Sequence, residues 1–368
     1  MKYNIKNLAS IIMTGTIVSA FSLWSIFGTK SDFSESERRV LAKFPEANAE
    51  TILSGRFMSD FESYALDHFP MRDTFRGIKS ASVLGVFRQS ETNGLYVQDG
   101  YLAKAEKELS DEMLNHAAER FQYIYDTFLK DTETNLYFSI VPDKHYFLSQ
   151  ESGRLAIDYD ILVSEMRNKT EYMKYIDIFP LLSIEDYYRT DTHWRQENIT
   201  DVAAAIGKAM GMNPDAEYAA IKLEKEFYGV YYGQLALPVK PDTLYYLNNS
   251  ILNECIVTSY NTGLPVKKSI YDMEKAQGRD PYEMFLCGAD PLITIENPNA
   301  KTDRELVVFR DSFGSSLVPL LVGEYSKITL VDIRYMQSAA IGSFVEFDNQ
   351  DVLFLYSTLI LNNSLGLK

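Results

Sequence analysis

An uncharged run near the start of the sequence limits what the chain can fold into more than any other feature. Residues 8–27 are apolar or weakly polar throughout, and no charged residue lies between Lys6 and Lys30. A helix of about 20 such residues is long enough to cross a lipid bilayer. Lys2 and Lys6 precede the run, so the positive-inside bias places the N-terminus in the cytoplasm and everything from about residue 30 outside it.

Two other interpretations of this run are a cleaved signal peptide and a buried core helix. Ser19 and Ala20 make a poor cleavage site, and the apolar run continues past them, so we favour an uncleaved anchor over residues 1–30. A core helix is disfavoured because the run is apolar on all sides, terminal and flanked by lysines. The sequence therefore predicts a single-pass protein of the cell membrane with an extracytoplasmic main domain.

The overall charge and composition exclude some partners. The formal net charge is −15 and the pI is near 4.8, so we expect no basic face for binding nucleic acid. The four histidines are scattered and the two cysteines, Cys255 and Cys287, form no metal-ligating motif; whether these cysteines pair stays open. We expect neither a metal nor a cofactor.

Strands and helices alternate along most of the chain, which is typical of a parallel α/β sheet with right-handed crossovers. Asp99-Gly100 favours a type I′ turn between two short strands, and Ser110 is placed to cap a helix. We expect strands at 135–141, 174–178, 306–309, 328–331 and 352–356. We expect helices within 51–82, interrupted by a turn at Phe69-Pro70, over 111–129, over 196–210 and from 316.

The same pattern indicates the domain organisation. We divide the chain into a membrane anchor at 1–30, a linker with a helical and hairpin segment at 31–110, and an α/β domain at 111–368. Residues from about 215 to 285 break the alternation, because they are rich in Tyr, Gly and Asn and contain only short β-like runs. We interpret them as a β-rich insertion in the α/β domain.

A serine lies in a turn that follows the expected strand at 306–309. The turn reads Arg310-Asp311-Ser312-Phe313-Gly314, and an apolar helix is expected after it. Sites in parallel α/β sheets lie at the carboxyl ends of strands, and backbone N–H groups at the start of a helix can bind an oxyanion. Ser312 is therefore a candidate nucleophile; the alternative is a helix cap rich in Ser and Gly.

The segment Asp191-Thr192-His193-Trp194 supplies the groups that would activate such a serine. A serine hydroxyl is a weak nucleophile that needs a base, and a carboxylate can hold the base in the required tautomer. Residues i and i+2 of an extended segment point to the same side, so Asp191 and His193 can face one pocket. The alternative is a surface turn, with Trp194 either lining the pocket or belonging to the core.

Taken together, these two segments resemble the DHHW family and the alginate O-acetyltransferase-like proteins of the SGNH hydrolase superfamily. Residues 67–73 (DHFPMRD), residues 141–144 (VPDK) and Gly288 with Pro291 match as well. The resemblance runs from about Ser34 to the C-terminus. It implies an SGNH-hydrolase-like fold, in which a parallel sheet is flanked by helices.

The resemblance also implies roles for individual residues. Ser312 would be the nucleophile, His193 the base and Asp191 its orienting partner. Thr192 stands where the name-giving motif has a second histidine. Arg310 stands where the serine motif often has glycine, which would alter access to Ser312.

Gly288 and Lys144 are further candidates for lining the site. Gly288 is the candidate oxyanion donor through its N–H, whereas Asp290 stands where the superfamily would have an amide. Lys144 lies at the end of an expected strand, where it would either line the site or serve the structure.

The activity implied by the resemblance is acetyl transfer to an extracytoplasmic cell-surface polysaccharide or exopolysaccharide. Because acetyl-CoA is not expected outside the membrane, a membrane-bound O-acyltransferase partner would supply the acetyl group. One alternative is a carbohydrate acetyl esterase of the same fold, in which water instead of a sugar attacks the acyl-enzyme. The other is a non-catalytic component that binds or assembles polysaccharide. The sequence alone does not separate these three.

Overall fold

The computed structural model describes residues 5–34, 36–212 and 216–368. Lys2, which contributes to the expected orientation, and residue 215, where the β-rich segment was expected to start, lie outside the described residues. The chain divides into two compact units, Met1–Asn93 with Tyr232–Val239 and Gly94–Tyr231 with Lys240–Lys368. The larger unit therefore begins earlier than residue 111, where the sequence analysis placed the start of the α/β domain.

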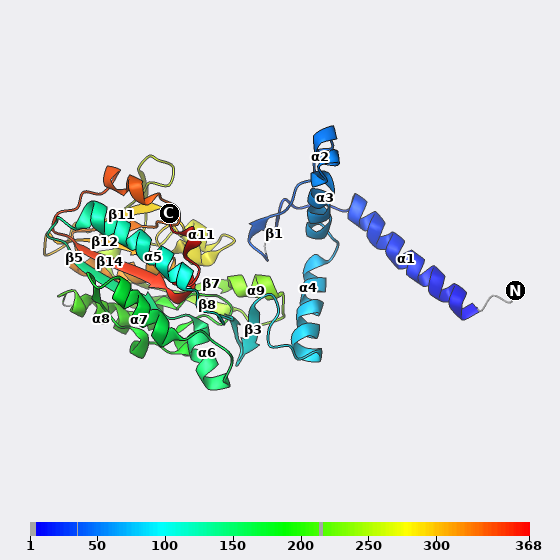
Figure 1. Ribbon diagram of the computed structural model, residues 1–368, viewed down its shortest axis with the longest axis horizontal. Coiled ribbons are helices and arrows are strands. Elements are labelled where there is room, and N and C mark those ends of the chain that lie inside the picture. Colours follow the sequence, from blue (N-terminus) through cyan, green and yellow to red (C-terminus); the bar gives the residue numbers. More distant parts are fainter. Residues whose placement is uncertain (1–4, 35, 213–215) are drawn as a thin grey trace. The chain divides into compact units, whose positions relative to one another are not determined.

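The smaller unit begins with the apolar helix expected from the sequence. Helix α1 spans Ile5–Phe27, and its part Lys6–Phe27 is long and apolar enough to cross a membrane (Figure 1). None of its most apolar window is buried inside the protein. This exposure disfavours a core helix, because about 20 apolar residues that the protein does not bury need another apolar medium.

The rest of the smaller unit consists of short elements, which are β1 (Phe33–Ser34), β2 (Arg39–Val40), α2 (Ala49–Leu53), α3 (Arg56–Asp67), α4 (Arg72–Ala81) and a π-helical turn (Ser82–Val86). The helical region at 51–82 is interrupted at Phe69-Pro70, as expected, and once more near its start. One break lies at Gly55, which has a φ of +77°, and another lies around Pro70.

Ion pairs hold this unit together around the 67–73 motif. Asp67 accepts hydrogen bonds from the Arg39 guanidinium and from the N–H of Ala42. The bond from Arg39 lowers the pKa of the Asp67 carboxyl to about 2. Arg72 pairs with Glu37. The motif therefore fixes the turn at residues 37–42 against helices α3 and α4.

The larger unit is built around one sheet. Its strands are β5 (Asn135–Val141), β6 (Lys174–Tyr175), β9 (Ile256–Ser259), β10 (Val266–Lys268), β11 (Leu292–Glu296), β12 (Glu305–Arg310), β13 (Lys327–Val331) and β14 (Asp351–Ser357). Their order across the sheet is β10-β9-β11-β13-β12-β14-β5-β6. Strands β13, β12, β14, β5 and β6 run parallel, whereas β10, β9 and β11 pair antiparallel. The five expected strands are present, although the one expected at 174–178 is shorter.

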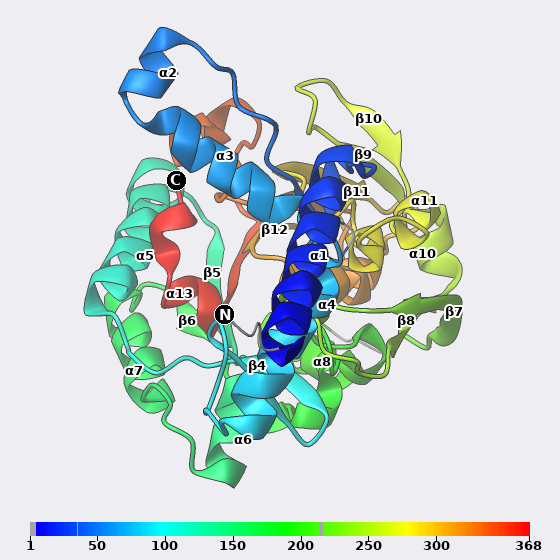
Figure 2. The same cartoon turned by 90° about the vertical axis from the view of Figure 1, so that its right-hand side faces the viewer.

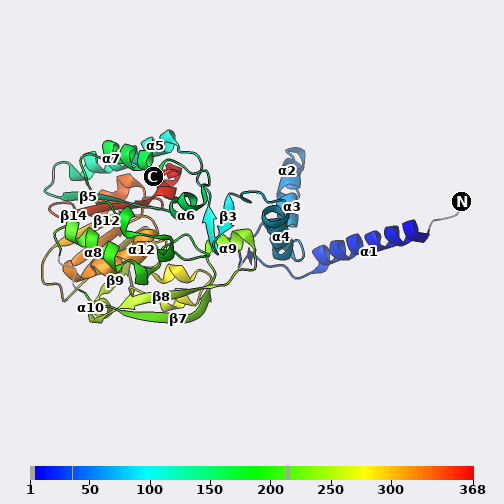
Figure 3. The ribbon, with the colours of Figure 1, turned by 90° about the horizontal axis from the view of Figure 1, so that it is seen from below.

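Helices cover both faces of this sheet, because side chains along a buried strand point alternately to either side. Val307 and Phe309 of β12 belong to a core shared with α5 (Asp111–Ile124) and α7 (Tyr159–Lys169). Leu306 and Val308 belong to the opposite core, shared with α8 (Thr200–Ala209) and α12 (Phe313–Leu317). Figure 3 shows these two layers, and Figure 2 shows α13 (Thr358–Leu361) beside α5. The predicted fold class, a mostly parallel sheet flanked by helices, is confirmed.

Two hairpins lie outside the main sheet. In β3 (Leu95–Gln98) and β4 (Tyr101–Lys104) the turn residues Asp99 and Gly100 both have positive φ, as a type I′ turn requires. The other hairpin, β7 (Ala219–Phe227) and β8 (Asp242–Asn248), lies within the segment interpreted as an insertion. Strands β9 and β10 of the same segment join the edge of the main sheet. The remaining α-helices are α6 (Lys144–Ser152), α9 (Val230–Leu235), α10 (Ser250–Glu254) and α11 (Met273–Ala276).

Candidate active site

Ser312 lies at the carboxyl end of β12, between that strand and α12. The side chain of Asp311 fixes this turn: one carboxylate oxygen accepts the N–H of Phe313 (3.0 Å) and the other accepts the N–H of Ser357 (2.7 Å), at the end of β14. The N–H of Ser312 donates no hydrogen bond within the described residues. It is therefore available to an oxyanion that forms next to its own hydroxyl.

His193 comes from a tight loop that is closed by backbone hydrogen bonds. Tyr187 and Trp194 form an antiparallel bridge, and the N–H of Tyr188 donates to the carbonyl of His193 (3.1 Å). The loop between them presents Asp191, which is almost fully buried, and His193, whose side chain is 12% exposed. A base in such a position is reachable by substrate while its carboxylate partner is shielded from water.

The two segments meet in one hydrogen-bonded chain. His193 Nδ1 lies 2.6 Å from a carboxylate oxygen of Asp191, and His193 Nε2 lies 2.7 Å from Ser312 Oγ. Because an ionised carboxylate only accepts, Nδ1 carries the proton and Nε2 is left to accept the Ser312 hydroxyl. This arrangement can remove a proton from Ser312 as the oxygen attacks a carbonyl carbon. The turn expected at 310–314 and the Asp-x-His segment are thus brought together.

The second oxygen of Asp191 is held by a residue pair that the sequence analysis missed. Asp191 Oδ2 accepts the N–H of Val230 (2.9 Å), and the N–H of Gly229 donates to Thr190 Oγ1 (2.8 Å). A Cβ at position 229 would lie 2.3 Å from the Cα of Asp191. The backbone therefore approaches Asp191 as closely as only glycine permits. The Tyr-Gly-Val at 228–230 was the available signal, but it lay in the segment interpreted as an insertion.

Comparison with protein families supports the sequence resemblance. Residues 152–331, which include both Asp191 and Ser312, match the family model described as DHHW protein. The matched segment covers just under half of the chain.

Solved structures with a similar fold are also found. A DHHW family protein from Eubacterium siraeum has a TM-score of 0.59 at 22% identity, covering 75% of this chain and 95% of its own. Bacillus cereus PatB1 with a sulfonyl adduct has a TM-score of 0.60 at 21% identity, with coverages of 73% and 95%. At these identities the likeness shows a shared fold. A search of curated proteins found no match.

Lys144 lies outside the matched segment 152–331. Its side chain nevertheless binds the loop that carries Asp191 and His193. Its buried ammonium donates to the carbonyls of Tyr188 (3.0 Å) and Arg189 (3.2 Å) and lies 5.0 Å from the centre of the Tyr231 ring. Burial lowers the pKa of Lys144 to about 7, against the opposing effect of Asp191. Of the two expected roles, its contacts are those of a structural support for the loop.

Replacing Lys144 tests its structural role through the pH dependence of the unfolding free energy. Between about pH 7 and its ordinary pKa of 10.5, Lys144 is neutral when folded and protonated when unfolded, so its contribution to stability increases with pH. The cost of burying its charge is fully present below pH 7. From pH 7 to 9, the unfolding free energy of the wild type should rise by about 1–2 kcal/mol relative to Lys144→Met. Denaturant unfolding of the full chain in detergent at both pH values measures this, and a constant difference contradicts it.

Trp194 lies in the core of the larger unit rather than on a pocket wall. The ring is fully buried, and its N–H lies within reach of Ser316 Oγ (2.8 Å) and the carbonyl of Phe313 (3.2 Å). It thereby ties the loop of His193 to the helix that follows Ser312.

Tyr282, which the sequence did not single out, contacts the candidate base His193 directly. It comes from the 3₁₀ turn Pro281–Met284, and its ring lies 3.8 Å from that of His193, centre to centre, at an angle of 5°. Its hydroxyl lies 2.9 Å from Ser316 Oγ. The sequence contains 25 tyrosines, and no motif distinguishes Tyr282 from the others.

Gly288 does not offer its N–H as expected. That N–H donates to the carbonyl of Phe285 (3.0 Å), and the Gly288 carbonyl accepts from Arg310 (3.0 Å). The candidate oxyanion donor is therefore occupied, and the free N–H of Ser312 is the better placed group. The Asp290 carboxylate accepts a hydrogen bond from Ser259.

Arg310 is fully buried beneath the serine turn. Its guanidinium lies 3.5 Å from the Asp332 carboxylate, and its side chain packs where a Cβ on Gly314 would clash. It thus packs against the turn that carries Ser312. The expectation that it alters access to Ser312 stays a prediction.

No metal site is present among the residues that the structure describes, since no three His, Cys, Asp or Glu side chains are grouped to hold an ion. Cys255 and Cys287 are free thiols, which settles the pairing that the sequence left open. Burial raises the pKa of each thiol to about 11, so neither is a ready nucleophile.

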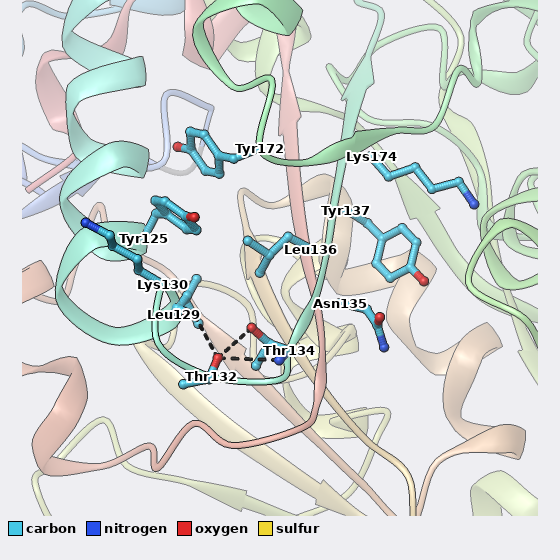
Figure 4. A pocket seen from close by; sticks show the side chains of 10 residues that line it. All are labelled: Tyr125, Leu129, Lys130, Thr132, Thr134, Asn135, Leu136, Tyr137, Tyr172 and Lys174. Atoms are coloured by element: carbon cyan, nitrogen blue, oxygen red, sulfur yellow. Dashed lines mark hydrogen bonds between the residues drawn. The ribbon is translucent and has the colours of Figure 1, made fainter.

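A separate cavity of about 360 Å³ lies at the opposite, amino-terminal end of β5. Figure 4 shows Tyr125 and Tyr172 on one side of it and Tyr137 with Lys174 on the other. The strand between this cavity and the end of β5 near Lys144 is seven residues long. The cavity is therefore distinct from the site around Ser312.

Proposed function

We propose that this protein is an extracytoplasmic O-acetyltransferase that moves acetyl groups onto a cell-surface polysaccharide or exopolysaccharide. The observation that carries the proposal is the continuous hydrogen-bonded chain Asp191–His193–Ser312, with a free N–H on Ser312. The motifs shared with the alginate O-acetyltransferase-like proteins favour acetyl transfer over other acyl chemistry. Helix α1 would anchor the chain with the larger unit outside the membrane.

In the first half of the reaction, Ser312 Oγ would attack the carbonyl carbon of an acetyl donor. His193 Nε2 takes the hydroxyl proton, and Asp191 stabilises the imidazolium. The N–H of Ser312 donates to the carbonyl oxygen as it gains negative charge. When the tetrahedral intermediate collapses, the bond to the donor breaks, His193 gives its proton to the leaving group and acetyl-Ser312 remains.

In the second half, a sugar hydroxyl would attack acetyl-Ser312. His193 takes the proton of that hydroxyl, the bond to Ser312 Oγ breaks, and His193 returns the proton to Ser312. The acetyl ester ends on the sugar and the enzyme is restored. A membrane-bound O-acyltransferase is the proposed source of the acetyl group, since the reaction needs an acetyl donor outside the cytoplasm and no cofactor.

The decisive experiment asks where the acetyl group goes. The full chain in detergent is given p-nitrophenyl acetate with and without oligosaccharides from the cell envelope, and both free acetate and acetylated sugar are measured. We expect acetylated sugar to account for most of the acetyl group released when the acceptor is present. Release as free acetate alone would favour an esterase. Absence of ester cleavage together with retained glycan binding would favour a non-catalytic component.

A further inference from the structure

The plane of the His193 ring is set by more than its two hydrogen bonds. Tyr282 covers one face of the imidazole almost in parallel, at 3.8 Å and 5°, while Phe313 approaches it tilted by 60° at 5.1 Å. Two hydrogen bonds to Asp191 and Ser312 leave the imidazole free to swing about the line that joins them. A ring stacked on its face removes that freedom.

The position of Tyr282 is itself fixed by the active-site elements. Its ring is buried, and its hydroxyl lies 2.9 Å from Ser316 Oγ, which also receives the Trp194 N–H at 2.8 Å. Ser316 belongs to the helix that follows Ser312, and Trp194 follows His193 in the chain. The phenol is thus held by the same two segments whose meeting forms the site.

The chemistry of the pair favours the charged form of the base. The face of an aromatic ring carries partial negative charge and attracts a cation placed over it. The imidazole becomes such a cation when it takes the proton of Ser312. Charged groups also surround the pair, with Asp191 on the same loop, Asp311 and Arg310 from the serine turn, and Lys144 behind the loop. These groups are retained in every variant compared below, so the effect of the ring at position 282 can be measured separately.

We propose that Tyr282 is a positioning residue, whose ring keeps His193 aligned between Asp191 and Ser312 and stabilises the imidazolium formed during acyl transfer. The proposal rests on the proposed function only in requiring that Ser312 is activated by His193. The ring, and not the hydroxyl, supplies both effects. Burial keeps the ring in place without the hydroxyl.

The test compares Tyr282→Phe, Tyr282→Leu and Ser316→Ala with the wild type, as full chains in detergent. The readouts are kcat/KM for p-nitrophenyl acetate and the rate of labelling by a fluorophosphonate probe, each from pH 5 to 9. Tyr282→Leu should lower both rates about tenfold and shift the acid limb of the profile to lower pH by about half a unit to one unit, with little change in KM. Tyr282→Phe and Ser316→Ala should stay within about threefold of the wild type, with an unshifted acid limb.

A fluorinated ring of nearly the same shape as phenylalanine separates the electronic effect of the ring from a loss of folding. Pentafluorophenylalanine at position 282 reverses the charge distribution of the ring, so its acid limb should shift to lower pH than that of Tyr282→Phe. The proposal is overturned if Tyr282→Phe falls as far as Tyr282→Leu, or if the fluorinated ring leaves the acid limb in place. Failure of the proposed function is a separate result, in which the probe does not label the wild type.

Discussion

Ser312→Ala is expected to lower acetyl-ester cleavage by at least about 10⁴-fold and to abolish labelling by a serine-reactive probe. The reason is that the Ser312 hydroxyl is the group within 2.7 Å of His193 Nε2, so no other oxygen is activated in its place. Water near His193 would give only slow residual hydrolysis. Rates of p-nitrophenyl acetate cleavage and gel fluorescence after labelling measure the two effects.

A neighbouring serine provides the matched control. Ser315 lies one turn along the same helix, and its buried hydroxyl has no hydrogen-bond partner among the described residues. Ser315→Ala removes the same atom without touching the chain from Asp191 to Ser312, so its rates should stay within about threefold of the wild type. Equal labelling of the wild type and Ser312→Ala would show that another residue is the nucleophile.

Gly229→Ala is expected to lower kcat/KM by more than about 100-fold, although residue 229 touches no substrate. A Cβ there would lie 2.3 Å from both the Cα and the Cβ of Asp191, so the loop must move. Any such shift also strains the bond from Val230 N–H to Asp191 and the 2.6 Å bond from Asp191 to His193. The overpacking should cost about 1–3 kcal/mol of unfolding free energy as well.

The control for this substitution is Gly323→Ala. A Cβ at position 323 meets only the end of the Ile251 side chain, at an ordinary 3.8 Å. That variant should keep the activity of the wild type. If Gly229→Ala unfolds, Val230→Pro is the alternative variant, because it removes the N–H that binds Asp191. Val230 is the first residue of α9, a position where proline is tolerated. Full activity in both Gly229→Ala and Val230→Pro would refute a role of this contact in positioning Asp191.

Much of the site followed from local sequence. Asp191 and His193 are two residues apart, so both can face one side of their loop. Ser312 follows a strand and precedes a helix, which places it at the carboxyl end of β12. The Asp99-Gly100 turn and the Ser110 cap were predictable for the same reason, since each depends on the preferences of one or two residues. Gly288 failed as an oxyanion donor because the partner of its N–H, Phe285, is set by a turn that no motif marks.

The sequence by itself determined an apolar N-terminal helix, an alternating α/β chain and the three side chains of a candidate triad. Each of these depends on the polarity or spacing of residues close together in the chain. Tertiary structure alone decided that Tyr282 covers His193, that Gly229 lies against Asp191 and that Lys144 binds the loop from behind. The residues in these contacts are 38 to 89 positions apart in the printed sequence. Packing of the whole domain sets their distances, because side chains with many possible neighbours acquire fixed ones only when the core closes.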